Sequence, residues 1–183
     1  MKHLLLLLGL WLLSVLAVAQ EETPQGLLID WHPSGTMIAY SRYYSYEVIV
    51  LDVNTNEVVN TFATSDPLFD APQWSPDGSL LTFLASLHSI AVWLNAWDPD
   101  FANQAYYLDM LDRLQLERAS PISGFAWHPS GTLLAHSVSS TIFVWDLATD
   151  EYRHLPRSNY ISNIADLQWF DEDTILLGDT SPR

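Results

Sequence analysis

The sequence predicts an all-β fold built from repeated sheets of four antiparallel strands. The first observation is a motif that recurs every ~45 residues, with copies that begin at Trp31, Trp74 and Trp127 and a weaker fourth copy at Trp169. It reads Trp-His-Pro-Ser-Gly-Thr in the first and third copies and Trp-Ser-Pro-Asp-Gly-Ser in the second. The second observation is that the similarity continues beyond the motif, because residues 36–41 align with 132–137 and residues 50–57 align with 144–151. The chain is therefore a repeat protein.

Each copy predicts the same series of strands and turns. An apolar strand ends at the tryptophan, and the proline that follows favours a tight turn because its ring fixes φ. Gly35, Gly78 and Gly131 supply the positive φ that lets the next strand begin. A third strand, such as 141–145, is β-branched and aromatic, and a polar turn leads into a fourth strand at 58–62 or 152–155. Four strands in about 45 residues form one blade of a β-propeller.

The number of blades predicts an incomplete propeller. The repeats span about residues 27–62, 70–118 and 122–156, and residues 164–183 supply the first half of a fourth repeat. Closed propellers have about four to eight blades. We therefore expect the sequence to be the N-terminal part of a longer propeller protein, with self-association through the open propeller edges as the alternative.

The third strand of the third repeat ends in Trp145-Asp146, and Asp52 holds the same place in the first repeat. In this feature the repeats resemble the WD-repeat propeller family, and residues 71–78 also resemble the TolB-type propeller repeat of exported bacterial proteins. The resemblance implies a non-catalytic scaffold that binds a protein or peptide partner. Two alternatives stay open: the propeller portion of a larger exported enzyme such as a peptidase, and a propeller that binds a sugar or a peptide.

The first nineteen residues predict a secretory signal peptide. A short basic start is followed by the uncharged apolar run 4–19, which ends in the small-residue site Ala17-Val18-Ala19. The run is shorter than the ~20 residues that a membrane-spanning helix needs. We therefore expect cleavage before Gln20, no stable membrane insertion afterwards, and an exported protein in a periplasmic or extracellular compartment.

Composition and charge exclude several kinds of protein. The 183 residues include 22 Asp and Glu against 7 Lys and Arg, which gives a formal net charge of −15. A chain of this charge repels the phosphate backbone, so no nucleic-acid partner is expected. There is no cysteine, which rules out disulfides and cysteine-based zinc sites. No cofactor motif is present, and we expect no cofactor.

The second repeat carries an insertion at about 95–120. Tyr107, Met110, Leu111 and Leu114 have the spacing of one helix face, which favours a short amphipathic helix. A long hairpin of the outer strand is the competing interpretation. The oxygen-bearing residues at 98, 100 and 103 are of the type that binds calcium, but their spacing lacks the glycine and the distal glutamate of a calcium loop, so no metal site is predicted.

The best candidate for a binding surface is the connection between the second and third strands of the first repeat. It contains Arg42, Tyr43, Tyr44 and Tyr46, and Tyr and Arg are enriched among the residues that dominate binding energy. The competing interpretation is that the tyrosines only pack within their hairpin. His88 occupies the corresponding connection of the second repeat and is a further candidate contact residue.

The remaining histidines of the repeats are interpreted as packing residues. His32 and His128 stand in equivalent turns, and His136 aligns with Tyr40 and Phe83 at an aromatic position of the second strand. No arrangement of these residues predicts a catalytic group, and we expect no catalytic residue.

Overall fold

The computed structural model describes residues 26–98, 100, 105–109, 121–138, 140–155 and 164–179. Every element in these residues longer than a single turn is a β-strand. No helix in the described part of the chain has the length and apolar character that crossing a bilayer would require. The predicted signal peptide, residues 1–19, lies outside the described residues.

The strands form four antiparallel sheets in chain order, three of four strands and one of two. The first sheet contains β1 (Leu27–Trp31), β2 (Met37–Arg42), β3 (Glu47–Asp52) and β4 (Glu57–Ala63). The second contains β5 (Gln73–Trp74), β6 (Leu80–Ser86), β7 (Ser89–Leu94) and β8 (Ala105–Asp109). The third contains β9 (Ile122–Trp127), β10 (Leu133–Val138), β11 (Thr141–Asp146) and β12 (Glu151–Leu155), and the last contains β13 (Ile164–Trp169) and β14 (Ile175–Asp179).

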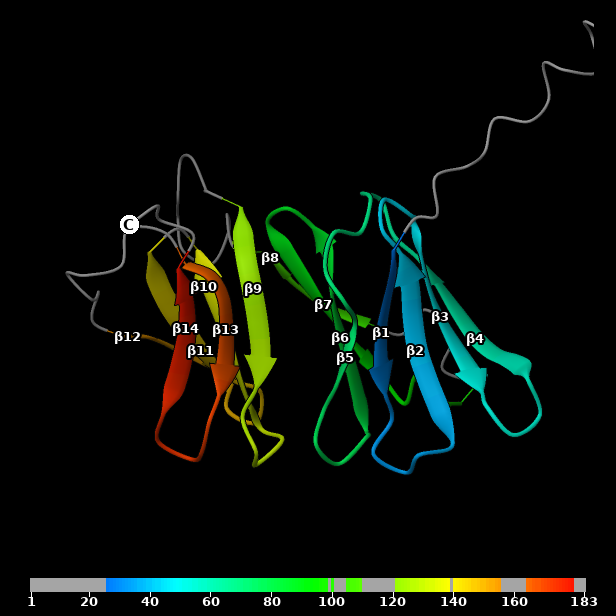
Figure 1. The fold of residues 1–183 in the computed structure, drawn as a ribbon. Coiled ribbons are helices and arrows are strands. Elements are labelled where there is room, and N and C mark those ends of the chain that lie inside the picture. Colours follow the sequence, from blue (N-terminus) through cyan, green and yellow to red (C-terminus); the bar gives the residue numbers. More distant parts are fainter. Residues whose placement is uncertain are drawn as a thin grey trace, which may run out of the picture.

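The sheets stand side by side in an open array (Figure 1). The first strand of each sheet contacts the first strand of the next, which joins β1 to β5, β5 to β9 and β9 to β13. This is the relation between the innermost strands of neighbouring propeller blades, and the array does not close into a ring. The predicted all-β fold of four-stranded blades in an incomplete propeller is confirmed.

Because strands alternate in direction, the turns gather at two ends of the array. The Trp-turn end, at the bottom of Figure 1, holds turns 32–36, 53–56, 75–79, 95–98, 128–132, 147–150 and 170–174. The Tyr-turn end, at the top of Figure 1, holds the β2–β3 and β6–β7 turns and connection 64–72.

Apolar side chains bury the junctions between sheets. Phe62 of the first sheet packs on Phe83 and Trp93 of the second, with ring centroids 5.0 and 5.2 Å apart. The second junction buries Val92 and Trp127, and Leu167 lies buried in the third. Each sheet therefore covers the neighbour that precedes it, and burial of this apolar surface is the main stabilising term.

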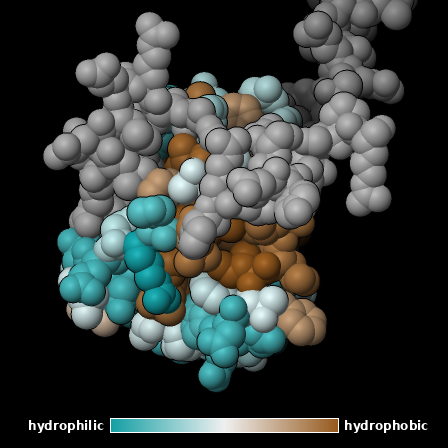
Figure 2. Space-filling view, turned by 90° about the vertical axis from the view of Figure 1, so that its left-hand side faces the viewer, coloured by the Kyte–Doolittle hydropathy of each residue, from teal (hydrophilic) through white to brown (hydrophobic). Residues whose placement is uncertain are grey.

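Among the described residues, no sheet covers the two outermost faces of the array. Leu27, Ile29 and Trp31 alternate along β1 on one face and are 57, 43 and 57% exposed. At the other side, a hollow of about 390 Å³ lies beside the two-stranded sheet and is lined by Ile142, Leu155 and other residues of the last two sheets. Figure 2 looks onto this side and shows hydrophobic surface between hydrophilic patches. The described residues thus present apolar surface on both outermost faces of the array.

The repeat motif shapes the turns as predicted. Gly35, Gly78 and Gly131 have φ values of 71°, 76° and 74°, which confirms the positive φ expected at these positions. Asp52 and Asp146 also act alike, because each carboxylate accepts backbone N–H bonds from the turn that follows it.

The turn histidines join neighbouring sheets, which confirms their packing role. The His32 ring lies edge-on to Trp74 at 4.7 Å, and its Nε2 is 3.1 Å from the carbonyl oxygen of Gly78. His128 repeats this arrangement with Trp169, at 4.5 Å, and with the carbonyl oxygen of Glu172, at 3.0 Å. We call this the histidine–tryptophan contact.

The second copy of the motif has no histidine, and its turn is held differently. The Ser75 hydroxyl donates a 2.6 Å hydrogen bond to Asp77, which also accepts bonds from Ser79. The Ser75 hydroxyl is the main reason why the pKa of Asp77 lies below its usual value. These bonds stay within one turn and do not reach the third sheet. Because Ser75 stands in place of the histidine, the junction between the second and third sheets lacks the histidine–tryptophan contact.

Around Tyr107, the structure shows the outer strand that the sequence left open as the alternative to a helix. Residues 105–109 form strand β8 and pair with β7, with Tyr107 opposite Ala91. The sheet ladder outweighs the helical spacing, since it satisfies the backbone groups of both strands. Met110, Leu111 and Leu114 lie outside the described residues.

His136 is a core residue, as its alignment with Phe83 predicts. It is fully buried, stacks on Phe143 at 5.4 Å and places Nε2 3.1 Å from the Tyr152 hydroxyl. Burial lowers the pKa of His136 to about 3, because an apolar site disfavours the charged ring.

Candidate functional site

The β2–β3 turn is held in one conformation by backbone hydrogen bonds to the segments around it. Tyr43 N–H donates to the Gly26 carbonyl at 3.0 Å, and Tyr44 N–H donates to the Leu68 carbonyl at 2.8 Å. The Leu68 N–H in turn donates to the Ser45 carbonyl. Tyr44 has a φ of 66°, which is uncommon for a residue with a side chain of this size. The turn is therefore built into the connection 64–72 rather than projecting freely.

Three aromatic rings form a cluster on this turn. The ring centroid of Tyr44 lies 4.7 Å from that of Tyr43 and 4.8 Å from that of Phe69, in edge-to-face geometry. The Tyr43 and Phe69 rings are 6.0 Å apart. Tyr43 and Tyr44 nevertheless stay 41% and 55% exposed. We call Tyr43, Tyr44 and Phe69 the aromatic surface.

The other predicted contact residues lie near it to different degrees. Arg42 and Tyr46 flank the turn and are exposed, Tyr46 at 53%. His88 lies in the β6–β7 turn of the neighbouring sheet, at the same Tyr-turn end, and is half-buried. The structure thus brings two of the five predicted residues into one cluster and places the other three around that end. Their role in binding stays a prediction.

Sequence reasoning missed Phe69. It belongs to the connection between the first and second sheets, 25 residues beyond Tyr44. The available signal is the apolar triplet Pro67-Leu68-Phe69 within an otherwise polar connection. An apolar group in a loop indicates that the loop packs on something. Here Leu68 is buried and Phe69 completes the aromatic surface.

Two half-buried carboxylates near the first strands of the sheets bond to backbone N–H groups. The Asp30 carboxylate accepts a 2.7 Å bond from the Trp74 backbone N–H and a 2.9 Å bond from Trp31 N–H, which ties the first sheet to the second. Burial raises the pKa of Asp30 despite these two bonds. Burial also raises the pKa of Asp70, and the charge of Asp166 adds to the shift.

The described residues contain no group of three or more acids or histidines arranged to hold a metal ion. What the aromatic surface offers is rigid, partly exposed ring area with polar hydroxyls. Such side chains bind other proteins with little loss of side-chain entropy. The arrangement is suited to recognition of a polypeptide.

Comparison with known proteins places the fold. No family model and no curated protein matches the chain. Among solved structures, U3-55K and the WD40 repeats of RRP9 are each 14% identical to it and match 84% of its length, with TM-scores of 0.65 and 0.66. The β-propeller domain of Cps50 (Swd1) from Myceliophteria thermophila matches 88% of the chain at 14% identity and a TM-score of 0.65.

These structures are WD40 propellers, so the predicted resemblance to WD-repeat propellers is confirmed for the fold. The chain spans 44 to 50% of the length of these proteins. At this identity the likeness concerns the fold and assigns no role to the residues of the aromatic surface.

Proposed function

We propose that this chain is an exported, non-catalytic interaction protein that binds a protein or peptide partner through the aromatic surface. The observation that carries the proposal is a cluster of three rings on a backbone fixed by hydrogen bonds, with two tyrosines about half exposed. Packing within the cluster buries part of the surface of each tyrosine ring. The remaining apolar surface is exposed to water, and a partner would cover it.

The position of the surface supports the same conclusion. It lies at the Tyr-turn end, where loops from different sheets are presented side by side. Loops on a rigid scaffold are common places for binding residues. The structural neighbours are WD40 propellers, a fold that generally serves protein–protein interaction.

Export is supported by the sequence. The basic start, the apolar run 4–19 and the Ala17-Val18-Ala19 site together have the order of a secretory signal. A chain without cysteine is also indifferent to an oxidising compartment.

Selection of phage-displayed peptides on the immobilised protein tests the binding function. Peptides that bind the wild type should bind a Tyr43→Ser, Tyr44→Asn variant at least tenfold more weakly. Asparagine suits position 44 because it tolerates positive φ, as Asn56 does at 59°. The control is Phe170→Ser, which removes an aromatic residue with 70% exposure from the Trp-turn end. Equal binding to the wild type and to the Tyr43, Tyr44 variant would contradict the proposal.

A further inference from the structure

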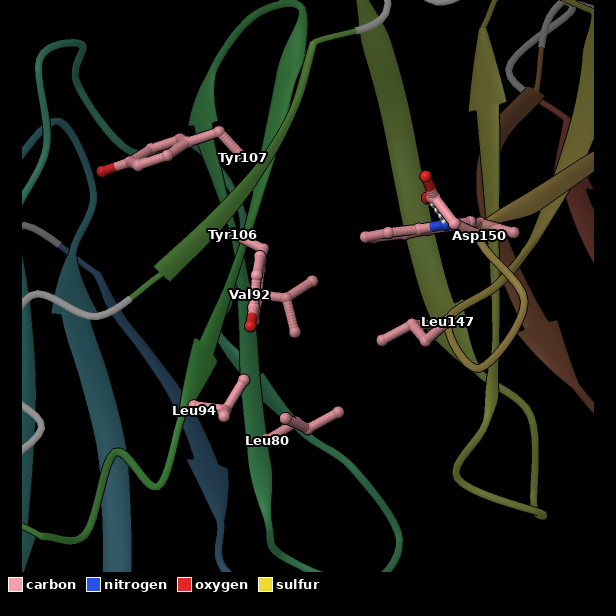
Figure 3. A pocket seen from close by; sticks show the side chains of 8 residues that line it. Leu80, Val92, Leu94, Tyr106, Tyr107, Leu147 and Asp150 are labelled. Atoms are coloured by element: carbon pink, nitrogen blue, oxygen red, sulfur yellow. Dashed lines mark hydrogen bonds between the residues drawn. The ribbon is translucent and has the colours of Figure 1, made fainter.

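A groove lies between the outer strands of the second sheet and the end of β11 in the third sheet (Figure 3). Its volume is about 460 Å³. The apolar and aromatic residues that line it are Leu80, Val92, Leu94, Tyr106, Trp145 and Leu147. Tyr107 borders the groove through its position in β8, but its ring points away, toward Phe62 of the first sheet at 6.4 Å.

The two walls of the groove differ in chemistry. Tyr106 stands on the side of the second sheet and is 64% exposed, although it is a large aromatic residue. On the opposite side, the Trp145 indole N–H donates a 3.0 Å hydrogen bond to the Asp150 carboxylate. This bond fixes a negative charge on the wall that faces Tyr106. The groove therefore combines an apolar floor with one positioned carboxylate.

Among the described residues, the charged side chains at the Trp-turn end are all acidic. The groove is lined by residues beside this end, where the turns and strand ends of the four sheets carry Asp52, Glu57, Asp77, Asp98, Asp146, Asp150, Glu151, Asp171, Glu172 and Asp173. No lysine or arginine lies at this end among the described residues. The two described arginines are Arg42, at the Tyr-turn end, and Arg153 within β12. Several of these acids hold their own turns, as Asp52 and Asp146 do, and they add to the negative potential all the same.

We propose that this groove binds a basic segment of a partner protein. One apolar side chain of that segment enters between Tyr106 and Leu147, and the lysines or arginines beside it face Asp150 and the acidic turns. Charge complementarity selects this occupant, because an acidic or neutral segment would meet the same field without a favourable partner charge. The site is at the end of the molecule opposite the aromatic surface and does not depend on the function proposed there.

The test uses a fluorescein-labelled peptide, Lys-Lys-Phe-Leu-Lys-Lys, titrated with the whole protein and followed by fluorescence anisotropy. In a second peptide, serines replace Phe and Leu, and in a third, glutamates replace the lysines. We expect the first peptide to bind at least tenfold more tightly than either of the other two. Binding should weaken as salt is raised, because part of the attraction is between charges near the surface.

Matched variants locate the site. Asp150→Asn keeps an oxygen for the indole bond and suits the φ of 59° at this position, so it should fold. It should weaken binding at least threefold, whereas Glu47→Gln, which removes one exposed charge at the Tyr-turn end of the first sheet, should have no effect. Tyr106→Ser should weaken binding about tenfold, and Tyr46→Ser, at the opposite end, should not.

Two outcomes would overturn the proposal. If the serine peptide binds as tightly as the apolar one, the attraction is charge alone and the groove is not used. If Asp150→Asn and Tyr106→Ser bind the apolar peptide as the two controls do, the peptide binds elsewhere.

Discussion

The contact between His32 and Gly78 allows a quantitative test of how the first two sheets are joined. A Cβ built on Gly78 would overlap the His32 ring, since it would lie 2.7 Å from Cε1 and closer still to Nε2. Gly78 also has a φ of 76°, which strains any residue with a side chain. Gly35 has the same strain, with a φ of 71°, but a Cβ there would meet nothing within 4 Å. Comparison of substitutions at Gly35 and Gly78 therefore separates the cost of backbone strain from the cost of losing the His32 contact.

We expect Gly35→Ala to lower the free energy of unfolding by about 1 kcal/mol, from strain alone. Gly78→Ala carries the same strain and also displaces His32. The displaced ring loses its hydrogen bond to the residue 78 carbonyl, worth about 1 kcal/mol net, and its edge-to-face contact with Trp74, worth about 1 kcal/mol. The total for Gly78→Ala is therefore about 3 kcal/mol.

A double-mutant cycle with His32→Ala measures the coupling. Once the ring is absent, Gly78→Ala should cost about 1 kcal/mol, which gives a coupling of about 2 kcal/mol. The assay is urea unfolding followed by tryptophan fluorescence at one fixed protein concentration, since self-association would shift the midpoint. If Gly78→Ala costs the same with and without His32, the histidine–tryptophan contact does not stabilise the junction and the argument is wrong.

Three further predictions concern pH, association and export. His136 is held neutral with a pKa of about 3 against 6.5 when unfolded, so its contribution is complete above pH 6.5 and is lost as the pH falls toward 3. Between pH 7 and pH 5.5 the loss is about 1 kcal/mol. The variant His136→Phe, which copies the residue at the equivalent position 83, should remove this pH dependence from the urea midpoints, and an unchanged pH dependence would contradict the assignment. The exposed apolar face of the first sheet should make residues 20–183 self-associate in sedimentation, and Ile29→Ser with Val58→Ser should reduce this; a monodisperse wild-type monomer would show that the face needs no cover. N-terminal sequencing of the exported protein should begin at or near Gln20, and an intact first methionine in a membrane fraction would refute cleavage.

The strands and turns of the fold could be predicted from the sequence because turn chemistry acts locally and the repeats align. Trp31, Trp74, Trp127 and Trp169 each end the first strand of a sheet, as their motif predicts. In the first three copies, the proline and glycine that follow the tryptophan act on the chain within a few residues, so the turn can be predicted without knowledge of the rest of the fold. The alignment of His136 with Phe83 likewise identified a buried position, because equivalent positions of a repeat face the same environment.

Contacts between sheets could not be read in the same way. The bond from the Trp74 backbone to Asp30 joins residues 44 positions apart, and no spacing rule connects them. Phe69 joins the tyrosines of the aromatic surface only because connection 64–72 folds back on the β2–β3 turn. Around Tyr107 the sequence leaves a helix and an outer strand open, and pairing with β7 decides between them. The groove beside Tyr106 depends on the packing of two sheets and leaves no mark in the sequence.

The histidine–tryptophan contact occurs at the first and third junctions of the described sheets, whereas Ser75 takes the place of the histidine at the second. This contact therefore groups the sheets into two doublets, one of the first and second sheets and one of the third and fourth. The junction between the doublets is held by other contacts, among them the hydrogen bond from the Gln73 side-chain amide to the Phe125 carbonyl. The seam between the doublets also borders the groove. We expect this junction to separate first, in a partial opening that costs less free energy than global unfolding. In native-state hydrogen exchange, amides along the seam would then lose protection together, while each doublet exchanges as a cooperative unit of its own. Exchange in this pattern would make a pair of repeats, rather than a single repeat, the unit of stability in this protein.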